Sequence, residues 1–573
     1  MYSILLLLIL PVTLASSYCP LLGPVFPIPK SLCNNAAITT AKHNISSILD
    51  ATTKGTSPLN SILDLNSTSF SLQIFSTGDS APLIEYSYTS PDIRSATVGV
   101  REVDGDTIFR IGSGSKLWTV LLLLIEKGDA VFAEPVAKYV PEIRDAVKEL
   151  SRNTTEKRDG IDFPRWEEIT IGELASHMSG IGRDYGFGDY SFLLDDPTAY
   201  GLPQLSDTDT PPCGRDTACS RANFFNGFLK RHPVVPSAST PVYSNAAFQI
   251  LAYALETMTS QTYEGLLVKD ILRPLGLNHS SYSKPDDKLG VIPGDVNSSY
   301  WALDSGDETP YRAGGLYSSV KDMSALGRAI LTNKLLSPAL TRRWMKPVTH
   351  TSSLAYSVGA PWEIYSFPSS RVIDLYTKAG DLGGYSSVLA LSPDHSVGFT
   401  ILAAGTQETT STTDVVSYLS DMISTTLIPA LEDAAKIEAA ARFTGVYAST
   451  KTNSSLTLTA DDGPGLKVQS WISNSDNLLG SLAQLKGYGN LDIRLYPTGL
   501  ESTNHVSFRA IIRDLSASRG IGPTTNSCIT WGTVDGMLYG SVGLDEFMFE
   551  LNQSGDVVGV SPGALRISLA RLV

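Results

Sequence analysis

Alternation of apolar and polar residues predicts strands in two parts of the chain. Near the N-terminus, residues 69–76 and 84–89 alternate in the way that half-buried strands do. After Lys436 the same period of two returns in short segments, separated by turn signals such as Asp462-Gly463 and Gly555-Asp556. These segments are 456–459, 466–469, 491–495, 506–509 and 547–551. Several short strands at this spacing predict a C-terminal β-barrel or sandwich.

Between these two regions the hydrophobic period is that of helices. Residues 115–125 are almost all apolar and predict a buried helix that ends near Gly128-Asp129. Residues 248–258 and 323–331 have the spacing of amphipathic helices. Because the strand pattern returns after Lys436, we expect a domain boundary near residue 438.

The N-terminus has the pattern of a secretion signal. Residues 4–10 are all apolar, Pro11 follows, and residues 15–17 are small, as at a cleavage site. A membrane anchor is the alternative, but the apolar segment is far shorter than the roughly 20 residues that span a bilayer. We therefore expect residues 1–17 to be a signal peptide of a secreted protein without an integral membrane segment. The following residues, 18–80, are expected to form an N-terminal arm.

Charge and histidine content exclude several kinds of partner. The chain has 44 Lys and Arg against 58 Asp and Glu, which gives a net charge of −14. An acidic chain without a long basic segment is a poor ligand for nucleic acids or anionic membranes. The 7 His include no His-x-His or His-x-x-x-His pair, so we expect no His-built metal site and no cofactor.

Cysteines and glycosylation signals fit an oxidising compartment. The simplest pairing of the 5 Cys is Cys19–Cys33 and Cys213–Cys219 with Cys528 left over, although sequence alone does not fix connectivity. Asn-x-Ser/Thr sequons permit glycosylation at Asn44, Asn66, Asn153, Asn278, Asn297, Asn453 and Asn552.

Two motifs compete for the role of nucleophile. The first, Gly559-Val-Ser561-Pro-Gly563, fits the Gly-x-Ser-x-Gly turn of α/β-hydrolases, in which the acid and the His lie downstream. The residues after Gly563 include no Asp, Glu or His, and Pro562 lacks a backbone N–H for an oxyanion hole. The order of residues along the chain therefore argues against a triad on Ser561, and we expect a turn there.

The second motif is Ser113-Gly-Ser-Lys116, at the start of the predicted helix 115–125. Residues i and i+3 share a helix face, so the Lys amine can approach the Ser hydroxyl. The backbone N–H of that Ser lies at the positive end of the helix, where it can stabilise an oxyanion. Taken alone, the motif favours an N-cap Ser and a solvated Lys over a catalytic pair. Tyr243-Ser-Asn245 and Lys378-Ala-Gly380 follow in an order and at a spacing that favour the catalytic interpretation.

Together these segments resemble the serine β-lactamases and penicillin-binding proteins, in particular the class C type. Residues 109–119 are similar to the nucleophile segment of that family, and Lys378-Ala-Gly380 is similar to its Lys-Thr-Gly motif. Residues 169–181, with His177, and residues 313–322 resemble two further segments of the family. The resemblance spans roughly residues 80–430, and the flanking parts resemble those of secreted fungal β-lactamase-like proteins.

The resemblance implies an α+β fold for a catalytic domain over residues 81–437. In this family an antiparallel sheet is flanked by helices, a helical lobe lies beside it, and the active site lies between them. Residues 438–573 would form the C-terminal all-β barrel or sandwich. His177 lies in none of the three catalytic motifs, so we expect a structural role for it.

The resemblance also implies a role for each motif residue. Ser113 would be the nucleophile, and Lys116 and Tyr243 would remove its proton, because a phenol whose pKa is lowered by lysines can act as a base. Asn245 would position Lys116 and the substrate amide. The remaining implied residues come from the third motif. Lys378 would hold Tyr243 and attract a substrate carboxylate, and Gly380 lies within the motif strand. The backbone N–H of Asp381 would complete the oxyanion hole with that of Ser113.

Two departures from the family pattern bear on the substrate. Ala379 replaces the Thr that helps β-lactamases to bind a substrate carboxylate, and Asp381 adds a negative charge. We therefore expect a secreted hydrolase that cleaves a small ester, amide or lactam through a Ser113 acyl-enzyme, rather than a dedicated resistance enzyme. Acyl transfer to an alcohol or amine, or binding without catalysis on the same scaffold, are the alternatives.

Overall fold

The computed structural model describes residues 18–57, 63–152, 160–214, 219–302, 314–369, 371–406, 411–517, 522 and 524–572. The expected signal peptide, residues 1–17, lies outside the described residues. The chain divides into two compact units. The larger unit contains Thr39–Ser366 and Asp374–Leu427, and the smaller contains Met1–Ile38, Phe367–Ile373 and Ile428–Val573.

An antiparallel sheet of eight strands forms the centre of the larger unit, in the order β2-β1-β10-β9-β8-β7-β6-β5. Its strands are β1 (Ser69–Ser76), β2 (Ile84–Tyr88), β5 (Thr349–His350), β6 (Tyr356–Val358), β7 (Glu363–Pro368), β8 (Val372–Leu382), β9 (Tyr385–Ser392) and β10 (Val397–Ala404). A short ladder of β3 (Phe109–Arg110) and β4 (Tyr317–Ser318) lies apart from it. The two N-terminal strands are confirmed where the alternation predicted them, so the sheet includes residues 69–76 of the expected arm.

Strand β1 is buried along its whole length, which differs from the half-buried strand that the alternation predicts. It lies between β2 and β10, and helix α11 packs against it. Its polar side chains have partners: Ser71 Oγ lies 2.8 Å from Ser87 Oγ, Ser69 Oγ donates to Ser90 Oγ at 3.0 Å, and Gln73 Nε2 donates to Glu85 Oε2 at 3.0 Å. Paired serines can therefore occupy a fully buried strand that the sequence makes look amphipathic.

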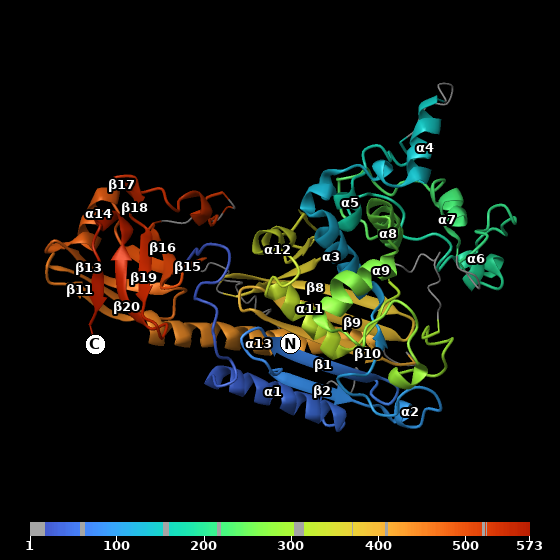
Figure 1. Cartoon of the computed structure of the whole chain (residues 1–573), viewed down its shortest axis with the longest axis horizontal. Coiled ribbons are helices and arrows are strands. Elements are labelled where there is room, and N and C mark those ends of the chain that lie inside the picture. The colour runs from blue at the N-terminus through green and yellow to red at the C-terminus, as the bar shows by residue number, and fades with distance from the viewer. Residues whose placement is uncertain are drawn as a thin grey trace, which may run out of the picture. The chain divides into compact units, whose positions relative to one another are not determined.

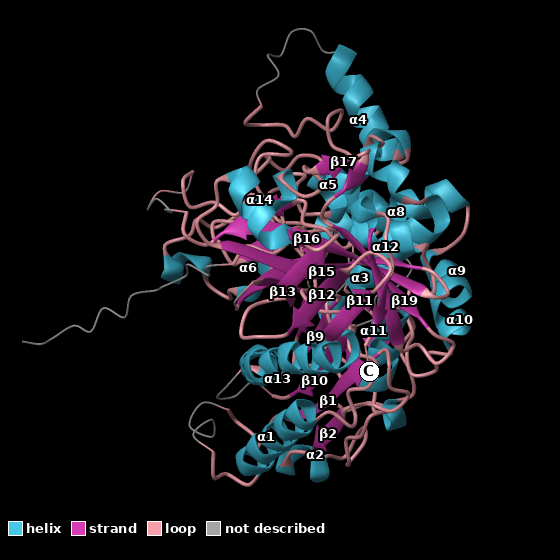
Figure 2. Ribbon diagram, turned by 90° about the vertical axis from the view of Figure 1, so that its left-hand side faces the viewer, coloured by secondary structure: helices cyan, strands magenta, loops and turns pink. Residues whose placement is uncertain are grey.

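Helices cover this sheet and form the adjoining lobe (Figure 1). The helices are α1 (Ala36–Thr53), α2 (Pro91–Arg94), α3 (Ser115–Lys127), α4 (Pro141–Arg152), α5 (Ile171–Ala175), α6 (Tyr190–Leu193), α7 (Arg221–Phe228), α8 (Asn245–Thr259), α9 (Tyr263–Leu267), α10 (Arg273–Leu275), α11 (Val320–Leu331), α12 (Pro338–Trp344) and α13 (Thr412–Phe443). Figure 2 shows α11 beside β9, β10 and β1, against which it packs, whereas α3 packs against α8 and α9. The three predicted helices are thus confirmed as α3, α8 and α11, and the α+β fold is confirmed. Among the helices described, none is both long and apolar enough to cross a bilayer.

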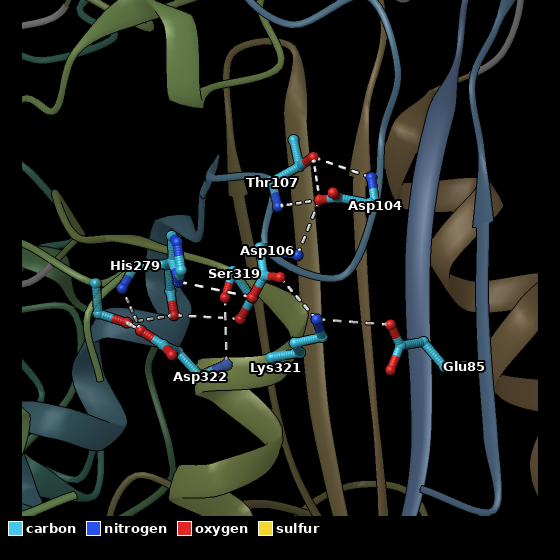
Figure 3. A network of polar contacts seen from close by, with 10 residues as sticks. Glu85, Asp104, Asp106, Thr107, His279, Ser319, Lys321 and Asp322 are labelled. Atoms are coloured by element: carbon cyan, nitrogen blue, oxygen red, sulfur yellow. Dashed lines mark hydrogen bonds and ion pairs between the residues drawn. The ribbon is translucent and has the colours of Figure 1, made fainter. Parts of the chain in front are cut away.

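A network of charged side chains fixes the start of α11 (Figure 3). Lys321 Nζ lies 2.7 Å from Asp106 Oδ2 and 4.0 Å from Glu85 Oε1, so this lysine joins the helix to β2 and to the loop before β3. The buried carboxylate of Asp322 accepts the backbone N–H of His279 at 2.8 Å. These contacts orient α11 on the eight-stranded sheet.

The smaller unit contains an antiparallel barrel, as the alternating C-terminal segments predict. Strands β12-β11-β21-β20-β19-β16-β15-β13 are neighbours in that order, and a β12–β13 pairing closes the ring. The strands are β11 (Gly445–Ser449), β12 (Ser454–Thr459), β13 (Leu466–Ser473), β15 (Leu491–Glu501), β16 (His505–Asp514), β19 (Glu546–Leu551), β20 (Val557–Pro562) and β21 (Leu569–Arg571), with β14 (Asp476–Asn477) added to β13 and α14 (Leu478–Lys486) after it. Ser561 of the Gly-x-Ser-x-Gly motif lies in β20 and pairs with Met548, so this segment is a strand and not the expected turn.

The disulfide pattern corrects one expected pair. Cys213 and Cys219 are bonded as predicted, but Cys19 bonds to Cys528, and Cys33 is a free, exposed thiol. Thr530 Oγ1 donates to the carbonyl of Cys19 at 2.6 Å, so the N-terminal segment lies along the residues that follow Cys528 within the smaller unit. Proximity in sequence predicted the wrong partner because the fold brings together cysteines that are 509 residues apart.

An ionic cluster lies in the wall of the barrel. The guanidinium of Arg494, which is 1% exposed, donates to Asp461 Oδ1 at 2.7 Å and Oδ2 at 2.8 Å, and to Asp492 at 3.0 Å. The hydrogen bonds from Arg494 lower the pKa of Asp461 to about 2. The cluster neutralises an arginine that would otherwise be buried without a partner.

We predict that Asp461→Asn destabilises the barrel at neutral pH and that this difference disappears in acid. A carboxyl group whose pKa is lower in the folded state contributes stability above its unfolded pKa, here near 3.8, and loses it as the pH falls toward 2. Allowing for partial exposure, the effect is about 1 kcal/mol. Thermal unfolding from pH 7 to pH 2.5 measures it.

Asp462→Asn is the matched control for this prediction, since the Asp462 side chain is fully exposed. It should unfold like the wild type across the same pH range. Equal behaviour of the Asp461 and Asp462 variants would contradict the assignment of this stability to the Arg494 cluster.

Candidate active site

Ser113 lies in a tight turn directly before α3. The turn is a 3₁₀ segment, Gly112–Gly114, and Gly112 has φ of +49°, which favours glycine. Ser115 Oγ donates to the carbonyl of Gly112 at 2.7 Å and accepts the backbone N–H of Leu316 at 3.1 Å. The turn is thereby fixed from two sides, and the half-buried Ser113 side chain remains accessible.

Lys116 reaches Ser113 from the first turn of α3. Its Nζ donates to Ser113 Oγ at 2.8 Å and to Asn245 Oδ1 at 2.7 Å. The residue is 1% exposed, and burial lowers the pKa of its amine below the usual value. Asn245, the first residue of α8, is itself held because its Nδ2 donates to Asp184 Oδ1 at 2.9 Å. The i, i+3 spacing on the helix thus brings the lysine amine to the serine hydroxyl.

The phenol of Tyr243 contacts the same serine oxygen. Its hydroxyl donates to Ser113 Oγ at 2.5 Å. The Nζ atoms of Lys116 and Lys378 lie 5.0 Å and 5.7 Å from the centroid of the Tyr243 ring. Burial alone raises the pKa of Tyr243, but the charges of the two lysines outweigh burial, so the pKa lies below its usual value. The Tyr243 phenol therefore loses its proton more easily at this position than a tyrosine does in water.

His177 supports Tyr243 from the loop after α5. Its ring stacks on the tyrosine ring with centroids 4.4 Å apart, and its Nδ1 accepts the backbone N–H of Ser244 at 3.2 Å. Burial and the charges of Lys116 and Lys378 lower the pKa of His177 well below its usual value, so the imidazole is neutral at neutral pH. A neutral ring that accepts at Nδ1 carries its proton on Nε2.

Lys378 lies on β8 and is paired with a residue that no motif marks. Its Nζ donates to Glu363 Oε1 at 2.6 Å and to the carbonyl of Ala379 at 2.7 Å. The lysine is 1% exposed, and the side chain of Glu363 is 19% exposed. Burial alone lowers the pKa of Lys378, but Glu363 and Tyr243 outweigh it and raise the pKa above its usual value. Lys378 is therefore a buried, permanently charged group.

The backbone of β8 passes closely against the turn that carries Ser113. A Cβ atom on Gly380 would lie 2.7 Å from the backbone nitrogen of Ser113 and 2.2 Å from the carbonyl oxygen of Ile111, so only glycine fits. Asp381 follows on the strand, and its carboxylate accepts hydrogen bonds from Ser386 at 2.7 Å and Thr413 at 2.6 Å. Its charge is thus engaged by two hydroxyls.

A cavity of about 700 Å³ lies beside these residues. Two of the residues that line it also contact the site: the Arg183 guanidinium lies 4.9 Å from the Tyr243 ring centroid, and Asp184 accepts from Asn245. Its other walls combine aromatic and aliphatic side chains, among them Tyr185, Phe187 and Leu202, with charged ones such as Asp189 and Arg231. A cavity of this size accommodates a small organic molecule.

The structure therefore groups all seven residues named from the sequence around Ser113 and adds others that the motifs do not show. Glu363 precedes Lys378 by 15 residues and reaches it only because β7 and β8 are neighbours. Arg183 and Asp184 come from a loop without a recognisable pattern. Among the described residues, no group of three or more His, Cys, Asp or Glu is placed to hold a metal ion.

Comparison with known families gives two matches. A family model described as beta-lactamase matches residues 88–416. A second, described as the C-terminal domain of beta-lactamase-like proteins, matches residues 435–573. Together the two matches cover the segments that carry the site and the barrel.

Several individual proteins are similar to this chain. A beta-lactamase-like protein of Arthroderma benhamiae is 30% identical over 95% of this chain and 94% of its own length. Two proteins named as probable hydrolases, from Phoma sp. and Cochliobolus lunatus, are each 25% identical over 72% of this chain. The alignments cover 69% and 70% of those two proteins.

We predict that Gly380→Ala slows the reaction of Ser113 with a fluorophosphonate by about 100-fold, the effect of losing one oxyanion donor. The added methyl group would meet the backbone of the turn that carries Ser113 and push it away from β8. Stopped-time labelling followed by intact mass spectrometry measures the rate. Gly160→Ala is the control, because a Cβ there meets nothing within 4 Å. Equal labelling of both variants would contradict the prediction.

Proposed function

The chain belongs to the β-lactamase family of hydrolases, and from that premise we propose that it is a serine hydrolase that cleaves an ester or amide through an acyl-enzyme on Ser113. The observation that carries the proposal is the double contact to Ser113 Oγ, from Lys116 at 2.8 Å and from Tyr243 at 2.5 Å. Serine is a poor nucleophile at neutral pH and needs a base within hydrogen-bond reach.

In the acylation step, the phenolate of Tyr243 takes the proton of Ser113, and Ser113 Oγ bonds to the carbonyl carbon of the substrate. The backbone N–H groups of Ser113 and Asp381 stabilise the negative oxygen that forms. Tyr243 then returns the proton to the leaving oxygen or nitrogen as the carbonyl bond to it breaks. The product is an ester between Ser113 and the acyl group.

Deacylation repeats the sequence with water. Tyr243 removes a proton from a water molecule, whose oxygen attacks the acyl carbon, and returns that proton to Ser113 Oγ. The acyl group leaves as a carboxylic acid. The charge of Lys116 stabilises the phenolate in both steps, and His177, neutral and stacked on Tyr243, holds the phenol in place without adding a further charge.

The protein is secreted in this proposal. Its support is the pattern of residues 1–17 together with two disulfides, because structural disulfides persist in oxidising compartments. The six sequon asparagines that the structure describes are all exposed: Asn44, Asn66, Asn278, Asn297, Asn453 and Asn552. Exposed sequons in a secreted chain are glycosylation sites.

The proposed activity is tested by a fluorophosphonate, which labels activated serines. We expect one adduct on the wild type and none on Ser113→Ala, and we expect Tyr243→Phe to slow labelling by about 100-fold or more through loss of the base. Hydrolysis of p-nitrophenyl butyrate should fall in parallel. Intact mass and circular dichroism of each variant separate chemistry from folding.

Ser561→Ala provides the control, because Ser561 is the serine of the competing motif. It should label and hydrolyse like the wild type. Labelling that survives Ser113→Ala, or that Ser561→Ala removes, would contradict the proposal.

We predict that the protein, expressed from its full sequence in a eukaryotic secretory host, appears in the medium without residues 1–17 and with N-linked glycans. Treatment with peptide N-glycosidase should then lower its mass and convert exposed sequon asparagines to aspartates that peptide mapping locates. Retention inside the cell with residues 1–17 intact would contradict secretion.

A further inference from the structure

We infer that the site selects substrates without a carboxylate on the leaving-group side of the scissile bond, and that Glu363 imposes this selection. The inference rests on the proposed function, in which Tyr243 returns its proton to the leaving group. Residues beside Tyr243 therefore face the leaving group, and Lys378 Nζ lies 5.7 Å from its ring centroid. The motif alone would make Lys378 the anchor for a substrate carboxylate.

The ammonium group of Lys378 already donates two of its hydrogen bonds within the protein. Of its three protons, one is donated to Glu363 Oε1 at 2.6 Å and one to the carbonyl of Ala379 at 2.7 Å. A substrate carboxylate would have to share this cation with Glu363. Two carboxylates that close to each other repel strongly beside a lysine that is 1% exposed.

Glu363 is held at both of its oxygens, so it does not simply swing away. Its Oε2 accepts the backbone N–H of Ala379 at 2.9 Å while Oε1 accepts from Lys378. Its own carbonyl accepts from Thr377 Oγ1 at 2.7 Å, which fixes the residue on β7 beside β8. A carboxylate with two donors in a fixed frame costs more to displace than an exposed one.

The balance of charge at the site leads to the same conclusion. Three cations, Lys116, Lys378 and Arg183, face two carboxylates, Glu363 and Asp184, which pair with Lys378 at 2.6 Å and with Arg183 at 3.4 Å. The carboxylate of Asp381, which also acts on Lys378, balances the remaining positive charge, and the phenolate form of Tyr243 then gives the site one negative charge. A further carboxylate from the substrate would make the site still more negative at the step in which an oxyanion forms.

Two tyrosines near Glu363 form an aromatic surface. Tyr356 of β6 and Tyr365 of β7 have ring centroids 4.7 Å apart, and Tyr365 is 50% exposed. Burial and the charge of Glu363 raise the pKa of Tyr365 above its usual value, so its phenol stays neutral. Such a surface fits a neutral aryl or alkyl leaving group, and the substrates we infer are neutral esters or amides.

The test compares two esters that differ only in charge: 3-carboxyphenyl butyrate and its neutral isostere, 3-carbamoylphenyl butyrate. We expect kcat/KM of the wild type to favour the neutral ester by about tenfold or more. Glu363→Gln keeps the size and an acceptor oxygen but removes the charge, and it should reduce or reverse this ratio. Glu102→Gln, the same change at an exposed glutamate outside the site, should leave the ratio unchanged.

A second readout does not need hydrolysis. Butylphosphonate esters with the same two leaving groups, 3-carboxyphenyl and 3-carbamoylphenyl, should phosphonylate Ser113 with the same preference, measured by intact mass. Equal rates for both leaving groups in the wild type, or a ratio that Glu363→Gln does not change, would overturn the inference and leave the proposed function standing. Failure of Ser113 to react with either probe would overturn both.

Discussion

Two lysines buried around one tyrosine are the constraint on which the site depends. Lys116 and Lys378 are each 1% exposed, and moving an ammonium group out of water is costly unless it finds charged or polar partners. Lys116 finds Ser113 and Asn245, and Lys378 finds Glu363. The pKa of Tyr243, which burial alone would raise, lies below its usual value because both cations are kept in place. Without those partners the lysines would lose their protons, and the pKa of the Tyr243 phenol would rise.

The fold serves mainly to bring three backbone segments to this point. The first turn of α3 supplies Lys116, the N-terminus of α8 follows Tyr243, and β8 supplies Lys378. The approach of β8 to the turn that carries Ser113 leaves no room for side chains, which is why both Gly112 and Gly380 are glycines. The sheet and the helices that cover it hold these segments in register, so the geometry of the site is set by packing far from the chemistry.

The range of each interaction along the chain decides whether the sequence alone can predict it. The helix over residues 115–125 and the barrel strands are local patterns, and both are observed. The contact of Lys116 with Ser113 is also local, because i and i+3 share a helix face. The Cys19–Cys528 bond depends on long-range topology that no local period encodes. Complete burial of β1 was missed for a related reason, since paired serines look polar in sequence.

Glu363 shows that a contact between neighbouring strands, which the sequence does not reveal, also changes what a motif implies about function. The Lys-x-Gly motif identifies a cation near the nucleophile, and from the motif alone that cation would attract a substrate carboxylate. The cross-strand pairing of β7 with β8 adds a carboxylate from the protein itself, 2.6 Å from the Lys378 amine. The same motif residue then holds a charge in place for Tyr243 instead of offering it to a ligand. A motif therefore fixes which groups react, whereas the neighbours that the fold supplies decide which molecules those groups can accept.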